Sequence, residues 1–168
     1  RLVYLGVAHG LATGDETRLV VDIGGGSTEV ILGEGLEARE RESLFMGCVS
    51  MTGRFFANGK ISPEAMERAI LAARVELRPV RRMFRAGAWQ AAVGSSGTIK
   101  AIERVVIANG WSEEGITRPS LKKLRRALLS AGHIDEVKLD GLSDDRRPVF
   151  AGGVAVLSAV FKALEIEK

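Results

Sequence analysis

The chain has 168 residues, of which 46% are hydrophobic and 27% are charged, which predicts one compact domain with its own core. A net charge of +3 is too small to indicate nucleic acid as a partner. The single cysteine, Cys48, excludes an internal disulfide, and His9 and His133 lack a metal-ligand spacing. No run approaches the roughly 18 apolar residues of a membrane span and no signal sequence is visible, so we expect a cytoplasmic protein without a membrane partner.

Strand and helix signals alternate along the chain and predict an α/β fold. Residues 1–9 are apolar-rich and predict the tail of a helix. Dense Val and Ile predict central strands at 18–23 and 28–32. Interleaved Glu and Arg predict a more exposed strand at 36–45, and a short strand is predicted at 89–93.

Helix signals occupy most of the remaining chain. A helix is predicted at 47–57, with three apolar side chains facing inward: Val49, Phe55 and Phe56. Ser62 marks the start of a second helix, which Pro79 should kink or end. Further helices are predicted from 99 onward, at 119–131 and at 148–164, the last apolar almost all round and therefore buried.

The most informative stretch is a glycine-rich turn between the first two predicted strands. It contains Gly24, Gly25, Gly26, Ser27 and Thr28. Glycines can take positive φ and allow close approach, so successive N–H groups can converge on one phosphate, and the two hydroxyls add donors. Asp22, at the end of the first strand, is placed to orient Mg²⁺ directly or through water, and Glu29 can help to polarise a water or hold the metal.

Spacing excludes two familiar phosphate loops at this turn. No lysine follows the glycines, as a Walker A loop requires, and Glu29 stands where a dinucleotide fingerprint needs a third glycine. A plain β-hairpin turn remains the alternative, although such a turn needs one or two glycines rather than three.

A second loop joins the strand at 89–93 to the helix that follows. It contains Gly94, Ser95, Ser96, Gly97 and Thr98. Free N–H groups at a helix start, together with the helix dipole, can bind an anion. An ordinary N-capped helix is the alternative for this loop by itself, but two such loops in one small unit favour phosphate binding.

Four motifs, in order, resemble the exopolyphosphatase and guanosine pentaphosphate phosphohydrolase family of the actin, Hsp70 and sugar-kinase superfamily. They are DIGGGSTEVILGEG, MGCVSMTGRFF, AVGSSGTIKAIERV and GLSDDRRPVFAGGVAVLSAVFKAL, and they run through essentially the whole chain. The resemblance implies a ribonuclease-H-like, actin-like ATPase fold with a mixed sheet flanked by helices. The second motif is somewhat more similar to exopolyphosphatases.

The resemblance also implies that residues 1–168 are the second actin-like subdomain of a larger protein. In the family, a first subdomain carries its own phosphate loop, and a glutamate regarded as the catalytic base would lie ahead of Arg1. The family continues beyond Lys168 into a strand and an Arg-Glu-Gly-type loop. We therefore expect the first subdomain as a partner, allow for a homodimer of the complete protein, and expect this chain alone to be nearly inactive.

The implied function is removal of terminal phosphate from inorganic polyphosphate with Mg²⁺ as cofactor. Guanosine pentaphosphate is the alternative substrate. Two other classes stay open: an actin-like or sugar-kinase ATP module, and a non-catalytic phosphate or alarmone sensor. Arg146 matches a family arginine that approaches the cleft, but an ion pair with a neighbouring carboxylate explains it equally well. The cluster of Arg81, Arg82 and Arg85 either grips polyphosphate or, as we favour, forms a solvated helical face.

Overall fold

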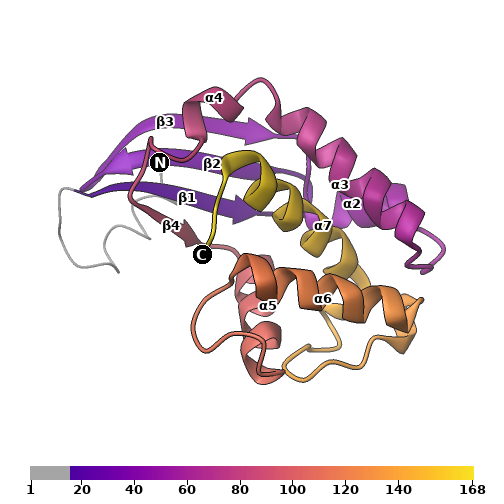
Figure 1. Ribbon diagram of the computed structural model, residues 1–168. Helices are drawn as coiled ribbons and strands as arrows, with labels where there is room; N and C mark the ends of the chain where they lie inside the picture. The colour runs from indigo at the N-terminus through magenta and orange to yellow at the C-terminus, as the bar shows by residue number, and fades with distance from the viewer. Residues whose placement is uncertain (1–15) are drawn as a thin grey trace.

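The computed structural model describes residues 16–168 (Figure 1). The prediction of a helix tail at 1–9 lies outside these residues. The strands are β1 (Thr17–Ile23), β2 (Thr28–Glu34), β3 (Glu37–Leu44) and β4 (Ala91–Gly94). The helices are α2 (Cys48–Phe55), α3 (Pro63–Leu77), α4 (Arg81–Phe84), α5 (Gly97–Ala108), α6 (Arg118–Ala131), the 3₁₀ turn η1 (Ile134–Glu136) and α7 (Arg147–Leu164).

The four described strands form one mixed sheet in the order β3-β2-β1-β4. β1 pairs antiparallel with β2, and β2 with β3, whereas β4 lies parallel to β1. β1 and β2 are largely buried and β3 is largely exposed, as their Val and Ile content and their interleaved charges predict. The α/β class and the mixed sheet flanked by helices are therefore confirmed.

Helix α7 is the centre of the core. Figure 1 shows it running between α3 on one side and α5 and α6 on the other. Two of its glycines permit very close packing: a Cβ at Gly152 would lie 2.4 Å from Oγ1 of Thr52, and a Cβ at Gly153 would lie 2.5 Å from Cγ2 of Thr98. The buried small-residue face of α7 thereby brings α2 and the start of α5 together.

By length and composition, α7 is also apolar enough to cross a membrane, but 78% of that stretch is buried within the described structure. Burial in the core accounts for this composition, because a helix that is hydrophobic all round needs apolar neighbours on every side. The prediction of a buried helix at 148–164 is confirmed.

Helix and strand boundaries agree with the sequence to within about two residues. The Ser62 hydroxyl accepts a hydrogen bond of 3.1 Å from the amide of Ala65, which caps α3, and α3 ends at Leu77, two residues before Pro79. The predicted strand at 89–93 is observed as β4, and α5 begins at Gly97 rather than at Ile99.

The inward orientation predicted for Val49 is wrong. Phe56 is buried and Phe55 is partly buried, but the side chain of Val49 is 55% exposed. Cys48 and Met51 are the residues of α2 that face the core. Because successive residues of a helix are rotated by about 100°, Val49 turns away from that face and lies beside the glycine-rich turn instead.

Candidate functional site

The two loops singled out in the sequence lie next to each other at one edge of the sheet. The glycine-rich turn follows β1 and the second loop follows β4, and parallel strands place their carboxyl ends at the same edge. The amide of Ser95 donates a 3.0 Å hydrogen bond to the carbonyl of Val21, which ties the start of the second loop to β1. The structure therefore brings together two segments about 70 residues apart in the chain.

The glycine-rich turn is held by the first turn of α2. The amide of Cys48 donates to the carbonyl of Gly24 at 2.9 Å, and the amides of Val49 and Ser50 donate to the carbonyl of Gly25 at 2.9 and 3.0 Å. Within the turn, the Gly24 amide donates to the carbonyl of Ser27 at 2.9 Å. The free N–H groups that open α2 are thus used to fix the loop, not to bind a ligand directly.

This anchoring determines which way the loop amides point. In a trans peptide unit the C=O and the following N–H lie on opposite sides. Because the carbonyls of Gly24 and Gly25 face α2, the amides of Gly25 and Gly26 face away from it. No acceptor for either amide is present among residues 16–168, and both glycines are exposed. Two adjacent donors are therefore available to an anion.

Gly47 makes the anchoring possible, although no role for it was predicted from the sequence. A Cβ at this position would lie 2.3 Å from the carbonyl oxygen of Gly25, so any side chain would push the loop off α2. Ser50 adds a side-chain contact, since its hydroxyl lies 3.0 Å from the Gly47 amide and 3.4 Å from the carbonyl oxygen of Gly26. The MGCVS motif contains both residues, but only the fold shows what they contact.

The glycines of the turn do not serve the purpose expected from their backbone freedom. None of Gly24, Gly25 and Gly26 adopts the left-handed conformation, so positive φ is not the reason for them. A Cβ at Gly24 would lie 3.1 Å from the Ser27 carbonyl oxygen, one at Gly25 would lie 3.4 Å from Val49, and one at Gly26 would meet nothing within 4 Å. Because they carry no side chains, the glycines instead leave the outward face of the loop, where the amides of Gly25 and Gly26 point, open to a ligand.

Asp22 and Glu29 are opposite each other in the β1–β2 ladder and therefore share one face of the sheet. Burial raises the pKa of the Asp22 carboxyl, and the negative charge of Glu29 raises this pKa further. The Glu29 carboxylate accepts hydrogen bonds from the hydroxyls of Ser27 and Ser43 at 2.8 and 2.9 Å. Neither carboxylate forms an ion pair within residues 16–168, and two carboxylates that repel each other favour an added cation.

The carboxylates of Asp22 and Glu29 are suited to Mg²⁺ only if other ligands complete its coordination. No group of three or more His, Cys, Asp or Glu residues that could hold a metal occurs within residues 16–168. Mg²⁺ commonly binds through one or two carboxylates and keeps several waters and phosphate oxygens as its remaining ligands. Asp22 and Glu29 fit that pattern.

The hydroxyls of the first loop are engaged within the protein. Thr28 is completely buried, and its hydroxyl donates to the carbonyl of Met46, which fastens β2 to the segment before α2. The expectation that the Thr28 side chain donates to phosphate is therefore wrong in this structure. The Ser27 hydroxyl donates to Glu29, so it positions that carboxylate.

The second loop is both an N-cap and a place where donors remain available. The Ser96 hydroxyl accepts a 3.1 Å bond from the Ile99 amide, as an N-capped helix requires. The amides of Gly97 and Thr98 are in the first turn of α5, and among the described residues neither has an acceptor. Gly94 is exposed, whereas Ser96 and Thr98 are buried.

Arg146 lies against this second loop. A Cβ at Gly97 would be 2.9 Å from Nη2 of Arg146, so the absence of a side chain at Gly97 leaves room for the guanidinium. Arg146 also forms an ion pair with Asp145 at 3.5 Å. The expected ion pair with a neighbouring carboxylate is confirmed, and the Arg146 guanidinium also adds a positive charge beside the second loop.

The Arg81, Arg82 and Arg85 cluster lies elsewhere. Arg81 donates to the carbonyl of Ala163 at 3.1 Å and pairs with Glu165 at 3.3 Å, near the C-terminal end of α7. All three arginines are exposed. Arg146 and the second loop contact the opposite end of α7, so the structure does not join this cluster to the candidate site.

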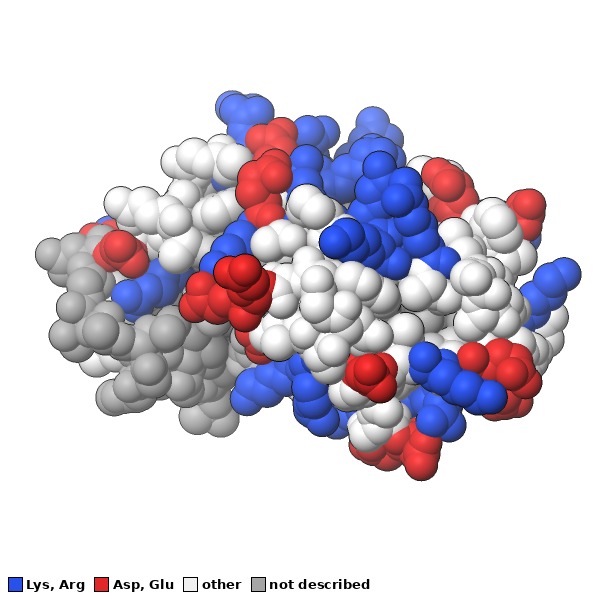
Figure 2. All heavy atoms as spheres, turned by 60° about the horizontal axis from the view of Figure 1, so that its bottom comes forward, with Lys and Arg blue, Asp and Glu red and all other residues white. Residues whose placement is uncertain are grey.

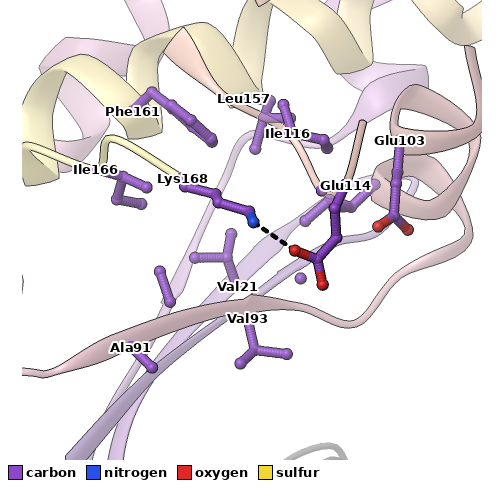
Figure 3. Close-up of a pocket in the computed structure, with 14 residues that line it drawn as sticks. Val21, Ala91, Val93, Glu103, Glu114, Ile116, Leu157, Phe161, Ile166 and Lys168 are labelled. Atoms are coloured by element: carbon purple, nitrogen blue, oxygen red, sulfur yellow. Dashed lines mark hydrogen bonds and ion pairs between the residues drawn. The ribbon is translucent and has the colours of Figure 1, made fainter. Parts of the chain in front are cut away.

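A hollow of about 540 Å³ lies along β4 (Figure 3), and Gly94 of the second loop is part of its lining. Its walls are mostly apolar and include Val21, Leu157 and Phe161. Figure 3 shows Glu103 and Glu114 among the residues that line it, with the carboxylate of Glu114 paired to Lys168 at 2.7 Å. Because Lys168 balances the charge of Glu114, Glu103 leaves a net negative charge in a mostly apolar lining, which does not favour an anion.

The fold and the adjoining loops define a domain of the actin-like ATPase fold with exposed backbone donors beside a carboxylate pair. Comparison with known proteins agrees. The model of the Ppx/GppA phosphatase family matches residues 1–168, and the chain belongs to this family.

Similar proteins include a guanosine-5'-triphosphate,3'-diphosphate pyrophosphatase of Vibrio vulnificus strain YJ016, which is 41% identical over 165 residues, covering 98% of this chain and 33% of the relative. A solved exopolyphosphatase of Cytophaga hutchinsonii superposes with a TM-score of 0.80 at 20% identity, over 99% of this chain and 56% of that one. The PPX-GPPA enzyme of Aquifex aeolicus gives 0.78 at 26% identity, over 98% and 56%. The chain thus spans about a third of the curated relative and about half of the solved structures.

Proposed function

We propose that this chain is the second actin-like subdomain of a Mg²⁺-dependent exopolyphosphatase and forms one wall of its catalytic cleft. The match to the Ppx/GppA phosphatase family supports the reaction class. The share of each relative that the chain covers supports the division into subdomains, because about half of each solved structure lies outside the matched region. The opposing wall is assigned to the first subdomain.

One observation carries the proposal: the carbonyls of Gly24 and Gly25 are held by α2, which turns the amides of Gly25 and Gly26 outward. Fixed donors bind a phosphoryl group without the reorganisation that flexible side chains need. The segment Gly24 to Thr28 holds one group of phosphoryl oxygens through its backbone. The loop Gly94 to Thr98, with Arg146 beside it, holds another.

Asp22 and Glu29 hold Mg²⁺ directly or through its waters in this proposal. The bound ion supplies charge neutralisation for the terminal phosphoryl group and its oxygens. Ser27 and Ser43 keep the Glu29 carboxylate in one orientation through their hydrogen bonds. Burial and the charge of Glu29 raise the pKa of Asp22, and a bound cation would favour its ionised form. Water attack also requires in-line positioning and a base, which we assign to a glutamate outside this chain.

Guanosine pentaphosphate is the second candidate substrate, and the Vibrio vulnificus relative favours it. That relative is named as a guanosine-5'-triphosphate,3'-diphosphate pyrophosphatase and is more similar in sequence, at 41% identity, than the exopolyphosphatase of known structure, at 20%. Both substrates end in a phosphoanhydride, so the same loops and carboxylates serve either one. The residues that would contact a guanosine are not identified by these loops.

The test is phosphate release by the complete protein, with no ATP added. Inorganic polyphosphate and guanosine pentaphosphate are compared as substrates at equal terminal-phosphate concentration, with Mg²⁺ and with EDTA. We expect Mg²⁺-dependent release from polyphosphate without ATP. Release that requires ATP would support the kinase-like class instead, and tight binding without turnover would support a sensor.

A further inference from the structure

A second surface of the molecule has features that the phosphate site does not use. α3 and α6 form the walls of a groove of about 480 Å³, and the C-terminal half of α7, at Ser158, Phe161 and Lys162, forms its floor. The candidate site contacts α7 near Gly152 and Gly153, at the other end of the helix. About five to ten residues of helix, or roughly 8–15 Å along the axis, separate the two places.

The rim of the groove is basic. Arg74 on α3, Lys122 and Arg125 on α6, and Lys162 on α7 line it, and Glu67 is the acidic residue among the lining side chains. Arg118 lines it too and pairs with Glu167 at 3.3 Å, whereas the other four cations form no ion pair within the described part of the chain. Figure 2 shows Lys and Arg side chains gathered near the top of the molecule, with few acidic side chains among them. The groove thus carries an uncompensated positive charge.

The interior of the groove is apolar. Ile70 and Leu71 on α3, Leu121 and Leu129 on α6, and Phe161 on α7 line it. Leu121 and Phe161 are buried, whereas Leu71 is 56% exposed and Ile70 and Leu129 are partly exposed. Apolar surface flanked by cations is poorly matched to a chain anion such as polyphosphate, which has no apolar part to place there.

The length of the groove corresponds to a short helix. Its lining on α3 extends from Pro63 to Arg74, and its lining on α6 extends from Arg118 to Leu129. Each stretch is roughly 16 Å long at 1.5 Å per residue, which is about three helical turns. Two helical walls with a helical floor offer the shape into which an amphipathic helix packs its apolar face.

We propose that the α3–α6–α7 groove is a docking site for an acidic amphipathic helix of a partner protein. The helix places apolar side chains, spaced three and four residues apart, over the exposed Leu71 and the partly exposed Leu129. Its flanking carboxylates pair with Arg74 on α3, with Lys122 and Arg125 on α6, and with Lys162 on α7. Charge complementarity requires a negatively charged partner. The apolar surface favours an amphipathic helix over a simple polyanion, because only the helix has apolar side chains to place on it.

The test uses a fluorescein-labelled synthetic peptide of about 12 residues, helical, with Leu at the buried spacing and Glu on both flanks. Its binding to the purified protein is followed by fluorescence anisotropy. We expect saturable binding that weakens about tenfold or more in the double variant Lys122→Glu/Arg125→Glu. The double variant Lys123→Glu/Arg126→Glu is the matched control, because it changes the same charge on the same helix outside the groove lining.

A second pair of variants tests the apolar surface. Leu71→Gln should weaken peptide binding, whereas Val75→Gln, at a residue of similar exposure on α3 that does not line the groove, should not. Absence of saturable binding, or equal effects of the two charge variants, would overturn the proposal. Binding that depends on Lys122 and Arg125 but not on Leu71, and that inorganic polyphosphate displaces completely, would also overturn it in favour of a polyanion site.

Discussion

Gly47 and Gly25 approach each other so closely that a Cβ on Gly47 would lie 2.3 Å from the carbonyl oxygen of Gly25 and 2.4 Å from its carbonyl carbon. Such a Cβ is fixed to the backbone of residue 47 and would overlap backbone atoms of Gly25, so no side-chain rotation could relieve the overlap. This contact seats the glycine-rich turn on α2 and thereby orients the outward amides of the candidate site.

Replacement of Gly47 by Ala should therefore both destabilise the protein and displace the loop. Forcing an extra methyl group into a packed site typically costs about 1–3 kcal/mol of the free energy of unfolding. Gly53→Ala is the control in the same helix: a Cβ there meets nothing within 4 Å, and Ala in a helix interior is favoured over Gly by about 0.5–1 kcal/mol. Urea unfolding of both variants measures the difference, and equal stabilities would contradict the anchoring role.

Asp22→Asn should raise the thermal stability near pH 7 in metal-free buffer. The pKa of Asp22 is higher in the folded protein than in the unfolded chain, so the folded state retains this proton at pH values where the unfolded state has lost it. The contribution of Asp22 to the free energy of unfolding therefore falls as pH rises from the unfolded pKa to the folded pKa and stays unfavourable above it. Asn removes that charge.

The measurement is the melting temperature of wild type and variant as a function of pH, with EDTA present. The excess of the variant's melting temperature over that of wild type should shrink as pH falls. It should vanish once Asp22 is protonated in both the folded and the unfolded state, below about pH 3. Asp140→Asn, at an exposed carboxylate, serves as the control. A melting temperature that is lower in Asp22→Asn than in wild type near neutral pH would show that the carboxylate stabilises the fold.

In the complete protein, the same substitution should reduce turnover. Removing one negative charge from a metal and phosphate site costs a few kcal/mol of transition-state stabilisation, which corresponds to a kcat lower by roughly 10²-fold or more. Glu29→Gln should act similarly, because it changes the other carboxylate of the pair. Phosphate release at saturating Mg²⁺ provides the comparison, and a near-normal kcat in either variant would remove that residue from the proposed site.

Gly97→Ala should weaken anion binding while leaving the fold intact. The new Cβ would lie 2.9 Å from Nη2 of Arg146, and the end of a long side chain can move away at little cost. Displacing the guanidinium should lower phosphate affinity several-fold. If Arg146 transmits the effect, Arg146→Gln should lower phosphate affinity by a similar factor, and the double variant should lower the affinity little further. Additive losses in this cycle would assign independent roles to the two residues.

A phosphate titration followed by amide NMR shifts should locate the anion at the two loops. The amides of Gly25, Gly26, Gly97 and Thr98 are the expected responders, since none has an acceptor among the described residues. The Cys48 amide, already bonded to Gly24, should respond less. Fixed donors hold a small anion better than exposed guanidinium groups screened by salt. Shifts confined to residues 81–85, with both loops silent, would overturn the phosphate assignment.

The elements that carry the site could be predicted from the sequence. Local rules were sufficient for the strand–turn–strand unit around Asp22 and Glu29 and for a helix after the second loop, because turns and helix starts depend on near neighbours in the chain. That Ser96 caps this helix, which begins at Gly97 rather than Ile99, came from the structure. The apolar composition of 148–164 likewise predicted a buried helix, since no other environment satisfies it. The family resemblance added the fold, which the family match confirms.

What each group in the loops contacts could be learned only from the folded structure. The Thr28 hydroxyl faces Met46, Val49 faces solvent beside Gly25, and Gly47 must be glycine because of a residue 22 positions earlier in the chain. None of these contacts has a local signature: they arise when α7, through Gly152 and Gly153, pulls α2 and α5 together. The direction of a loop's N–H groups is set by whatever holds its carbonyls, and in this protein that partner is a distant helix rather than the loop's own glycines.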